Sequence, residues 1–462
     1  MKLFPLLLLT FLISIHSKTA EEWRARSIYE ILTDRFARSD DANKTECTDL
    51  YKYCGGTYKG LINHLDYIQG MGFNAIWISP FVKNTPGSYH GYHMVSLYEV
   101  NEEFGTEQDL IDFIEECHKR DIWIMLDVVA NHVGEVKKAE DGTEDFSHIK
   151  PFNESKYYHD ECQITDWTDQ WMIENCRLAN LPDLKQEDEW VTQQLFEWIQ
   201  NIVTKYNIDG LRVDTVIEIP KWFWDGFKGY SNVFQIGEVF NGDPVYVNSY
   251  MEHLGSLFNY PLSFIIKDAF CGNLRRLEDY LINTRPHYTD PTIMGVFLEN
   301  HDNPRFLYNC GDKNKLVNAI AYTLTWEGIP VLYYGAEQYF DGGADPLNRE
   351  PLWETDFVQT DHYKLIGKIN KFRTESKFYE EEAVQRYVDN SFYAFTRGPR
   401  VLVCLTIQAN IEKVITYHEF EEGATLCNVL ADDGEEDCVV VTNGEIKIRM
   451  GAMPKIYNLK FK

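Results

Sequence analysis

The sequence predicts an α/β fold: a (β/α)8 TIM barrel with an inserted small domain after its third strand and a C-terminal antiparallel β domain. Three observations support this prediction. Eight short apolar runs alternate with amphipathic stretches along most of the 462 residues. One interval between runs is about twice as long as a single helical crossover needs. After about residue 377 the pattern changes to short strands of alternating polarity.

Each predicted barrel strand is a short run rich in β-branched or aromatic residues. In chain order the runs are 28–32, 75–79, 122–129, 211–213, 234–239, a weaker run at 257–262, 293–298 and 329–334. Amphipathic stretches separate them, and one of these places Val191, Leu195, Ile199 and Ile202 on a single helical face. Alternating strands and helices favour parallel pairing, and reactive residues of such barrels lie at the carboxyl ends of the strands.

The remaining boundaries follow from the unusual intervals. The long gap from residue 129 to 209 indicates an inserted domain at 133–184, between barrel segments 21–132 and 185–376. Runs at 391–397, 401–407, 445–450 and 455–461 indicate a C-terminal β-sandwich domain at 377–462. Lys2 and the apolar run at 3–15, followed by small residues, are typical of a secretory signal at 1–20.

Cysteine usage agrees with a secreted, extracellular protein. Three pairs are close enough for local loop closure, and a fourth pair is a longer-range suggestion; they are Cys47 with Cys54, Cys162 with Cys176, Cys427 with Cys438, and Cys271 with Cys310. Cys117 and Cys404 continue apolar patterns and are interpreted as buried thiols. Asn43 and Asn153 begin N-glycosylation sequons, which matter only in a eukaryotic secreted protein.

Composition excludes several classes of partner. The hydrophobic content of 44% is enough for a large core, and the net charge of −28 repels phosphate backbones and anionic lipid headgroups. We therefore expect no nucleic-acid partner and no membrane partner, and we expect the chain to act as a monomer.

Four segments place acids or histidines directly after apolar strand runs. They are Asp127-Val-Val-Ala-Asn-His132, Gly210-Leu-Arg-Val-Asp214, Gly237-Glu238-Val239 and Phe297-Leu-Glu-Asn-His301-Asp302. At one barrel mouth, Asp214, Glu238 and Asp302 would supply the acids that glycosidic cleavage needs. One carboxyl group must be ionised to attack the anomeric carbon, and another must stay protonated to donate to the leaving oxygen.

At these segments the chain resembles the α-amylases of glycoside hydrolase family thirteen, most closely the secreted fungal type. The resemblance covers nearly the whole mature chain through further motifs in the same order, including Leu32-Thr-Asp-Arg-Phe-Ala-Arg38, Tyr53-Cys-Gly-Gly56, Tyr89-His-Gly-Tyr92, Leu181-Pro-Asp-Leu184 and Asp345-Pro-Leu-Asn-Arg-Glu350. It implies a secreted endo-acting α-amylase that hydrolyses internal α-1,4-glucosidic bonds of starch and glycogen with retention of configuration.

The resemblance also implies a role for each site residue. Asp214 is implied to be the nucleophile, Glu238 the general acid/base and Asp302 the acid that holds sugar hydroxyls. The implied substrate-binding residues are Tyr92, His90, His132, Arg212, His301, Asp345 and Arg349. Arg212, on the same strand face as Asp214, would keep that carboxylate ionised. Asp127 is expected to brace the site rather than react.

A structural calcium ion is the one cofactor that the resemblance implies. The side chains of Asn131 and Asp183 and main-chain carbonyls near Glu174 and Glu218 match the family's calcium ligands, which tie the inserted domain to the barrel. Ligands that are all oxygen suit calcium.

Two departures from the fungal pattern leave alternatives open. Ile217 stands where that pattern has a cation on the leaving side, and His93 replaces its usual Trp. Product sizes therefore cannot be transferred from the family. The alternatives are a glycosyl-transferring or exo-acting enzyme of the same family, or a non-catalytic glucan-binding protein, although the latter would be expected to have lost triad acids.

Overall fold

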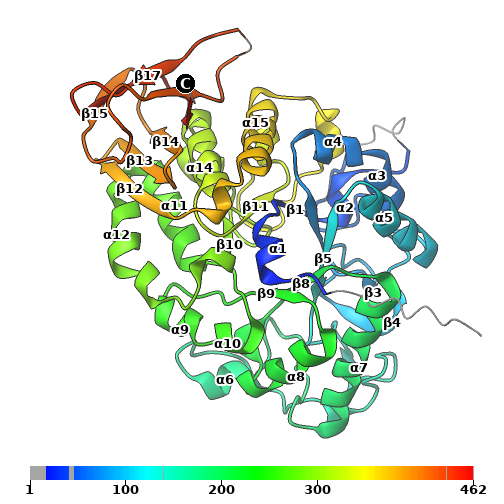
Figure 1. Ribbon diagram of the computed structural model, residues 1–462. Helices are drawn as coiled ribbons and strands as arrows, with labels where there is room; N and C mark the ends of the chain where they lie inside the picture. Colours follow the sequence, from blue (N-terminus) through cyan, green and yellow to red (C-terminus); the bar gives the residue numbers. More distant parts are fainter. Residues whose placement is uncertain (1–16, 41–45, 139, 433, 461–462) are drawn as a thin grey trace, which may run out of the picture.

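The computed structural model describes residues 17–40, 46–138, 140–432 and 434–460, which Figure 1 draws in colour. Most of the predicted signal at 1–20 lies outside these residues, and so does Asn43. Within the described part of the chain, no helix is long and apolar enough to cross a membrane.

The barrel sheet contains seven parallel strands, which confirm seven of the eight predicted runs. In spatial order they are β10 (Gly295–Phe297), β11 (Ile329–Tyr333), β1 (Ile28–Ile31), β2 (Ala75–Ile78), β5 (Trp123–Val128), β8 (Gly210–Val213) and β9 (Phe234–Gly237). Every residue of these strands is buried, which explains why the sequence shows continuous apolar runs here rather than alternation.

The weak run at 257–262 completes the ring without forming a strand. Leu257 bridges to Gly237 of β9, and Phe258 bridges to Gly295 of β10. Helix α11 (Tyr260–Gly272) begins directly afterwards, with Asn259 as its N-cap and Pro261 in its first turn. Because Pro261 has no N–H to donate to a β-sheet ladder, the extended segment ends after Leu257 and Phe258.

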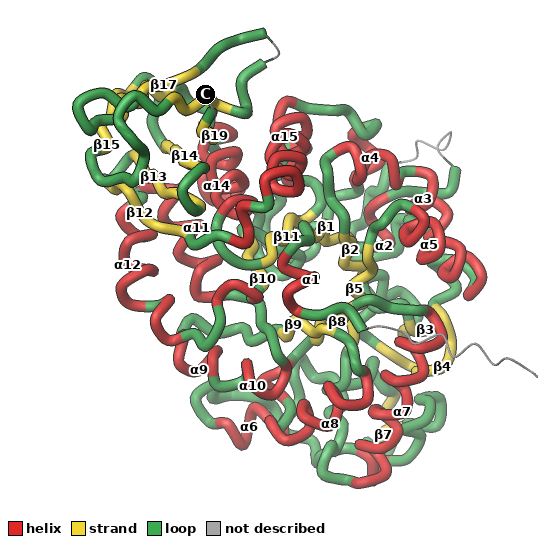
Figure 2. Tube along the Cα trace, viewed as in Figure 1, coloured by secondary structure: helices red, strands yellow, loops and turns green. Residues whose placement is uncertain are grey.

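Alternate residues of the strands pack on the two sides of the sheet. Trp77 and Met125 belong to a cluster inside the barrel, whereas Ile76 and Leu126 belong to the larger core between strands and helices. Figure 2 shows red helices around the yellow strands. The longer of these helices are α5 (Glu107–Lys119), α7 (Glu189–Tyr206), α8 (Lys221–Ser231), α11, α12 (Arg275–Asn283), α14 (Lys313–Thr325) and α15 (Asp361–Ser376); shorter ones include α1 (Ala20–Arg24), α2 (Thr33–Phe36), α3 (Tyr58–Asn63), α4 (Leu65–Gly70), α9 (Pro244–Asn248), α10 (Met251–Leu254) and α13 (Phe306–Cys310).

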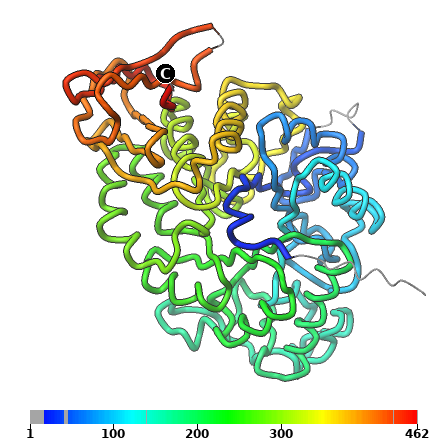
Figure 3. Tube along the Cα trace, in the orientation of Figure 1, coloured from blue at the N-terminus to red at the C-terminus, as the bar shows by residue number. Residues whose placement is uncertain are grey.

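An insertion follows the third barrel strand, as predicted. Between β5 and α7 the chain forms the short strands β6 (Lys137–Lys138) and β7 (Glu144–Asp145) and the helix α6 (Gln170–Asn175). The Cys162–Cys176 disulfide closes the loop before α6. Helix α6 packs against the 3-10 turn η2 (Val216–Glu218), which follows β8. In Figure 3 the insertion is the teal segment beside the green helices at the bottom of the view.

The C-terminal region is antiparallel, as predicted. Its six-stranded sheet has the order β12 (Ala383–Val388), β13 (Phe392–Arg397), β14 (Val401–Thr406), β19 (Lys455–Leu459), β16 (Thr425–Asn428) and β17 (Cys438–Val440), and β15 (Ile411–Ile415) pairs with β18 (Ile446–Met450). Strand β14 packs against α14 of the barrel, at the upper left of Figure 1.

The cysteine predictions are confirmed. The four predicted pairs form disulfides, Cys47–Cys54, Cys162–Cys176, Cys271–Cys310 and Cys427–Cys438, and Cys117 and Cys404 are free and buried.

Candidate active site

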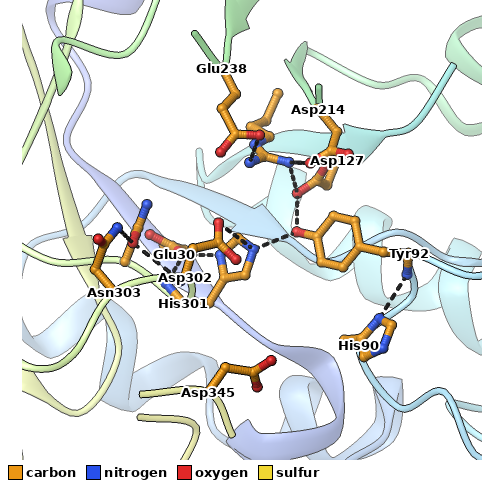
Figure 4. A network of polar contacts seen from close by, with 12 residues as sticks. Glu30, His90, Tyr92, Asp127, Asp214, Glu238, His301, Asp302, Asn303 and Asp345 are labelled. Carbon is orange, nitrogen blue, oxygen red and sulfur yellow. Dashed lines mark hydrogen bonds and ion pairs between the residues drawn. The ribbon is translucent and has the colours of Figure 1, made fainter. Parts of the chain in front are cut away.

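A cavity of about 550 Å³ opens at the carboxyl ends of the barrel strands. Asp214 directly follows β8, Glu238 directly follows β9, and Asp302 lies in the loop after β10. All three acids line the cavity, together with Tyr92, His132, His301 and Glu218. Figure 4 shows how most of these side chains point toward one another. The fold therefore brings residues from five distant segments to one site.

The guanidinium of Arg212 joins three carboxyl groups beneath the cavity. Its Nη1 donates to Asp214 Oδ1 at 2.5 Å and to Asp127 Oδ1 at 3.1 Å, and its Nη2 lies 2.9 Å from Glu238 Oε2. Arg212 is 1% exposed. Water therefore screens these contacts weakly, and the one cation offsets part of the repulsion among the acids.

The surroundings of Glu238 favour its protonated form. Burial, together with the nearby carboxyl groups of Asp214 and Asp302, raises its pKa to about 8, although Arg212 acts in the opposite direction. The hydroxyl of Tyr260, the first residue of α11, donates to Glu238 Oε1 at 2.9 Å. The main-chain N–H of Thr215 donates to Oε2 at 3.3 Å.

Asp127 is enclosed by hydrogen-bond donors. Its Oδ2 accepts from the indole of Trp77 at 3.0 Å and from the hydroxyl of Tyr92 at 2.7 Å, in addition to the Arg212 contact. Asp127 does not line the cavity, and its carboxylate contacts Trp77, Tyr92 and Arg212.

On the opposite side of the cavity, His301 and Asp302 are held by Arg349. The Nε of Arg349 donates to the carbonyl oxygen of His301 at 3.0 Å, and its Nη2 lies 3.4 Å from Asp302 Oδ1. Its Nη1 lies 3.0 Å from Asp345 Oδ1. Asp345 is about half exposed. The predicted pair Asp345 and Arg349 thus flanks Asp302 rather than lining the deepest part of the cavity.

His132 and His90 contact the backbone of Tyr92 from two sides. His132 Nε2 donates to the carbonyl oxygen of Tyr92 at 3.1 Å. The main-chain N–H of Tyr92 donates to His90 Nδ1 at 3.1 Å, and the two rings stack with their centroids 5.7 Å apart. Burial lowers the pKa of both histidines, which favours neutral rings. His93 lies against His90, with ring centroids 4.6 Å apart.

Oxygen atoms from the barrel and the insertion meet beside the cavity. The side-chain oxygen of Asn131 lies 3.0 Å from Asp183 Oδ1 and 3.2 Å from the main-chain oxygen of Glu218. Glu174 accepts from Gln170, whose amide also donates to the carbonyl oxygen of Ile217 at 3.1 Å. In the described part of the chain, no three His, Cys, Asp or Glu side chains gather as a metal site; the groups that meet here are an amide, a carboxylate and a main-chain carbonyl.

One wall of the cavity is apolar. Ile217, Trp167 and Phe240 line it, and the latter two side chains are about half exposed. Ile217, which departs from the fungal pattern, belongs to this wall.

Sequence reasoning did not identify Glu30 or Tyr260. Glu30 lies in β1, is 1% exposed, and accepts from His301 Nδ1 at 2.8 Å. An acidic residue inside an otherwise apolar strand was the available signal for Glu30, because a buried charge needs a specific partner. Tyr260 gave no such signal, since the run at 257–262 was predicted to be a strand.

Three comparisons with known proteins agree on one family. The model described as "Alpha amylase, catalytic domain" matches residues 30–393. "Alpha-amylase 1" of Lipomyces kononenkoae is 40% identical over 384 residues, which are 80% of this chain and 61% of that protein. "Alpha-amylase" of Saccharomycopsis fibuligera is 40% identical over 374 residues, 78% of this chain and 75% of that protein. The structure of an α-amylase from Malbranchea cinnamomea, 36% identical, has a TM-score of 0.90 and covers 96% of this chain and 98% of its own.

Proposed function

Because the chain belongs to the α-amylase family and is a glycoside hydrolase, we propose that it is a secreted, endo-acting α-amylase. It hydrolyses internal α-1,4-glucosidic bonds of starch, glycogen and related glucans with retention of configuration. The observation that carries this proposal is the single buried guanidinium of Arg212, which holds both Asp214 and Glu238 at the wall of one open cavity. Asp214 and Glu238, held by one guanidinium, supply the paired carboxyl groups of a retaining glycosidase.

The two acids have different tasks because their surroundings differ. Asp214, whose carboxylate contacts Arg212, attacks the anomeric carbon and forms a covalent bond to it. Glu238, whose pKa is raised by burial to about 8, gives its proton to the glycosidic oxygen, which leaves with the bond electrons. Water then attacks the anomeric carbon, returns a proton to Glu238 and releases Asp214.

The remaining residues bind the sugar. Asp302, about one-third exposed at the cavity wall, accepts hydrogen bonds from sugar hydroxyls as the ring distorts. His132 and His301 contact the same glucose. Tyr92, with His90 behind it, offers the ring on which an apolar sugar face rests. Arg349 and Asp345 bind the next glucose toward the non-reducing end.

We also propose that calcium binds at the three oxygens contributed by Asn131, Asp183 and Glu218. His132 donates from Nε2 to Tyr92, so a neutral ring accepts at Nδ1 from the Asn131 amide, 3.3 Å away. When the amide nitrogen of Asn131 donates to His132, the amide oxygen faces the oxygens of Asp183 and Glu218. Three oxygens this close need a cation between them. The carbonyl of Glu174 would contribute from α6. Calcium bound there would link the insertion to the barrel through its charge and would take no part in the reaction.

The same proposal covers the chain's organisation. The insertion at 133–184 and the region at 377–462 are small domains attached to a barrel formed by 21–132 and 185–376, and residues 1–20 direct secretion. Four disulfides are in keeping with an oxidising compartment. Asn153 is exposed and accessible to glycosylation. The partner is a glucan substrate, and the chain acts as a monomer.

The apolar wall favours one second candidate. Trp167 and Phe240, each about half exposed, can stack on a sugar that occupies the leaving side. A well-bound acceptor sugar there would compete with water for the glycosyl intermediate, so a transferase of the same family is the alternative function.

The test is a time course of products from soluble starch, with Asp214→Asn protein as the control for contaminating activity. An endo-acting retaining enzyme releases mixed oligosaccharides early, with α-anomeric ends. Release of one short sugar from the outset indicates exo action. Products longer than an added short acceptor indicate transfer. Absence of any product indicates a glucan-binding protein without catalysis.

A further inference from the structure

Glu30 is a buried acid beneath the cavity that the reaction described above does not use. It lies in β1, and its Oε1 accepts from two nitrogens of one residue, the main-chain N of His301 at 3.2 Å and the ring Nδ1 at 2.8 Å. Figure 4 shows Glu30 on the far side of the His301 ring from Tyr92. A carboxyl group in this place can control which ring nitrogen of His301 carries a proton.

The hydrogen bonds on the other side of the ring require a proton on Nε2. This nitrogen faces the hydroxyl of Tyr92 at 2.8 Å and Asp302 Oδ2 at 3.3 Å. The hydroxyl has one proton, and it donates that proton to Asp127. Both neighbours of Nε2 are therefore acceptors, and only a protonated Nε2 satisfies them.

Glu30 makes a protonated Nε2 possible in two ways. An ionised Glu30 accepts from Nδ1 of a doubly protonated ring. A protonated Glu30 donates to Nδ1 of a neutral ring, whose one proton is then on Nε2. Nε2 carries a proton in both arrangements.

We propose that Glu30 is a positioning residue that keeps Nε2 of His301 protonated, so that His301 presents a donor to Asp302 and to the sugar hydroxyl in the cavity. The part that concerns the sugar rests on the proposed glycosidase function. The part that concerns the protonation of the ring does not.

The electrostatic surroundings favour the neutral arrangement. Burial raises the pKa of Glu30, and Asp302 raises it further. Burial lowers the pKa of His301, and Arg349 and Arg212 lower it further. The titratable or charged groups that face this pair are Tyr92, His90, Arg212, Asp214, Asp302, Arg305, Tyr333 and Arg349.

Glu30→Gln removes the acid without changing its shape. The main-chain N–H of His301 requires an acceptor at the position of Oε1, so the amide oxygen must lie there. Nδ1 must then donate to that oxygen, and a neutral ring is left with a bare Nε2. Only a second proton on the ring restores the donor at Nε2. The variant therefore loses more activity as the pH rises.

The experiment measures kcat/KM on soluble starch for the wild type and Glu30→Gln across the pH range. We expect the variant to be about tenfold slower than the wild type at about pH 8 and to recover part of this loss as the pH falls. A ratio that does not change with pH overturns the proposal. Glu337→Gln is the matched control, because Glu337 is also fully buried and accepts from Tyr29 and Tyr67 away from the cavity. Its ratio to the wild type should not depend on pH.

Two further measurements keep the test decisive if Glu30→Gln folds poorly or the chain does not act on starch. In a His301→Gln background, Glu30→Gln should cause no further pH-dependent loss, because the ring through which Glu30 acts is absent. The ¹⁵N spectrum of the wild-type chain, assigned with His301→Gln, should show a proton on Nε2 throughout the neutral range. A bare Nε2 overturns the proposal whatever the substrate is.

Discussion

Glu238 and Asp214 share the guanidinium of Arg212, yet their surroundings differ in ways that suit the two tasks that we propose for them. Glu238 is additionally bonded by the hydroxyl of Tyr260 and by a main-chain N–H, and burial raises its pKa. Asp214 has the shorter contact to the guanidinium, 2.5 Å against 2.9 Å. A proton donor and a nucleophile can thus coexist at neutral pH.

Removing either acid should stop turnover and leave the fold intact. We expect Glu238→Gln and Asp214→Asn each to lower kcat on starch by at least about a thousandfold, because each amide keeps the shape and loses the proton or the charge. Melting temperatures and circular dichroism should stay near the wild type. Asp225→Asn, at an exposed carboxylate on α8, is the control and should retain full activity. Near-normal activity in either active-site variant would falsify the role assignment.

Activity should fall as the pH rises through about 8, since Glu238 must be protonated to donate and its pKa is raised by burial to about that value. The hydroxyl of Tyr260 lowers this pKa by bonding the charged form. Tyr260→Phe should therefore move the alkaline limb of kcat/KM to higher pH. A limb that stays in place, or moves to lower pH, would show that a different group controls it.

At the scale of elements, the early start of α11 connects the fold to the chemistry. Its N-cap Asn259 and its Pro261 end the extended segment after Leu257 and Phe258 have closed the ring. Tyr260 consequently lies in the first turn of a helix, where its hydroxyl reaches Glu238. A full sixth strand would have alternated its side chains across the sheet instead.

The turn between β12 and β13 depends on Asp389. Its Oδ1 accepts from the main-chain nitrogens of Ser391 at 2.8 Å and Phe392 at 2.9 Å, and its Oδ2 contacts Lys413 of β15 at 2.5 Å. Partial burial would raise its pKa, but Lys413 and the two amides outweigh that effect and lower the pKa to about 2. Asp389 therefore joins the main C-terminal sheet to the two-stranded β15–β18 sheet.

We expect Asp389→Ala to lower the free energy of unfolding by about 1–2 kcal/mol at neutral pH, through the lost turn bonds and ion pair. Asp389→Asn retains a side-chain oxygen that accepts the turn hydrogen bonds, so it should lower the free energy of unfolding by less. Because the folded pKa lies below the unfolded value of about 3.9, the charge stabilises the fold above that pH, and its contribution disappears as the pH falls toward about 2. Thermal melts of the wild type and Asp389→Asn should accordingly converge on acidification. A difference that persists at the acid end would contradict the assignment.

Across the whole molecule, the insertion and the barrel meet at the cavity wall. Asn131 follows β5, Asp183 closes the insertion, and Glu218 belongs to the turn after β8 that α6 packs against. A cation at their oxygens would therefore join three segments that are far apart in sequence. His159 also bonds Asp183, at 2.6 Å, and fixes its carboxylate from the solvent side.

On the proposed calcium site, removing calcium should lower the melting temperature by about 4–10 °C, because the ion would bind only the folded arrangement of these oxygens. The measurement compares melts in calcium and in a chelator, together with calorimetric titration of the stripped chain. Asp183→Asn should abolish most of the calcium response. Glu187→Gln, at a half-exposed carboxylate beside His159, should retain it. An unchanged melting temperature after chelation would exclude the site.

The sequence predicted those features of the fold that depend on residues close together in the chain. Seven barrel strands were visible as apolar runs because both of their faces are buried, and the disulfide pairs at short spacing were visible because short loops close easily. The sixth run was misleading, because helix capping at Asn259 competed with strand propensity. Glu30 was missed because nothing near it in sequence indicates that His301, 271 residues away, is its partner.

By itself the sequence determined which residues stand at the ends of the barrel strands, and so which acids could meet. Asp214, Glu238 and Asp302 follow directly from strand position and residue type. Only the tertiary structure decided that Glu238 is buried beside other carboxyl groups, which raises its pKa, that Tyr92 lies between His301 and Asp127, and that the Asn131 amide faces Asp183 and Glu218. The reason is physical: protonation and hydrogen-bond direction depend on burial and on every neighbouring charge, and segments far apart in the chain supply those neighbours.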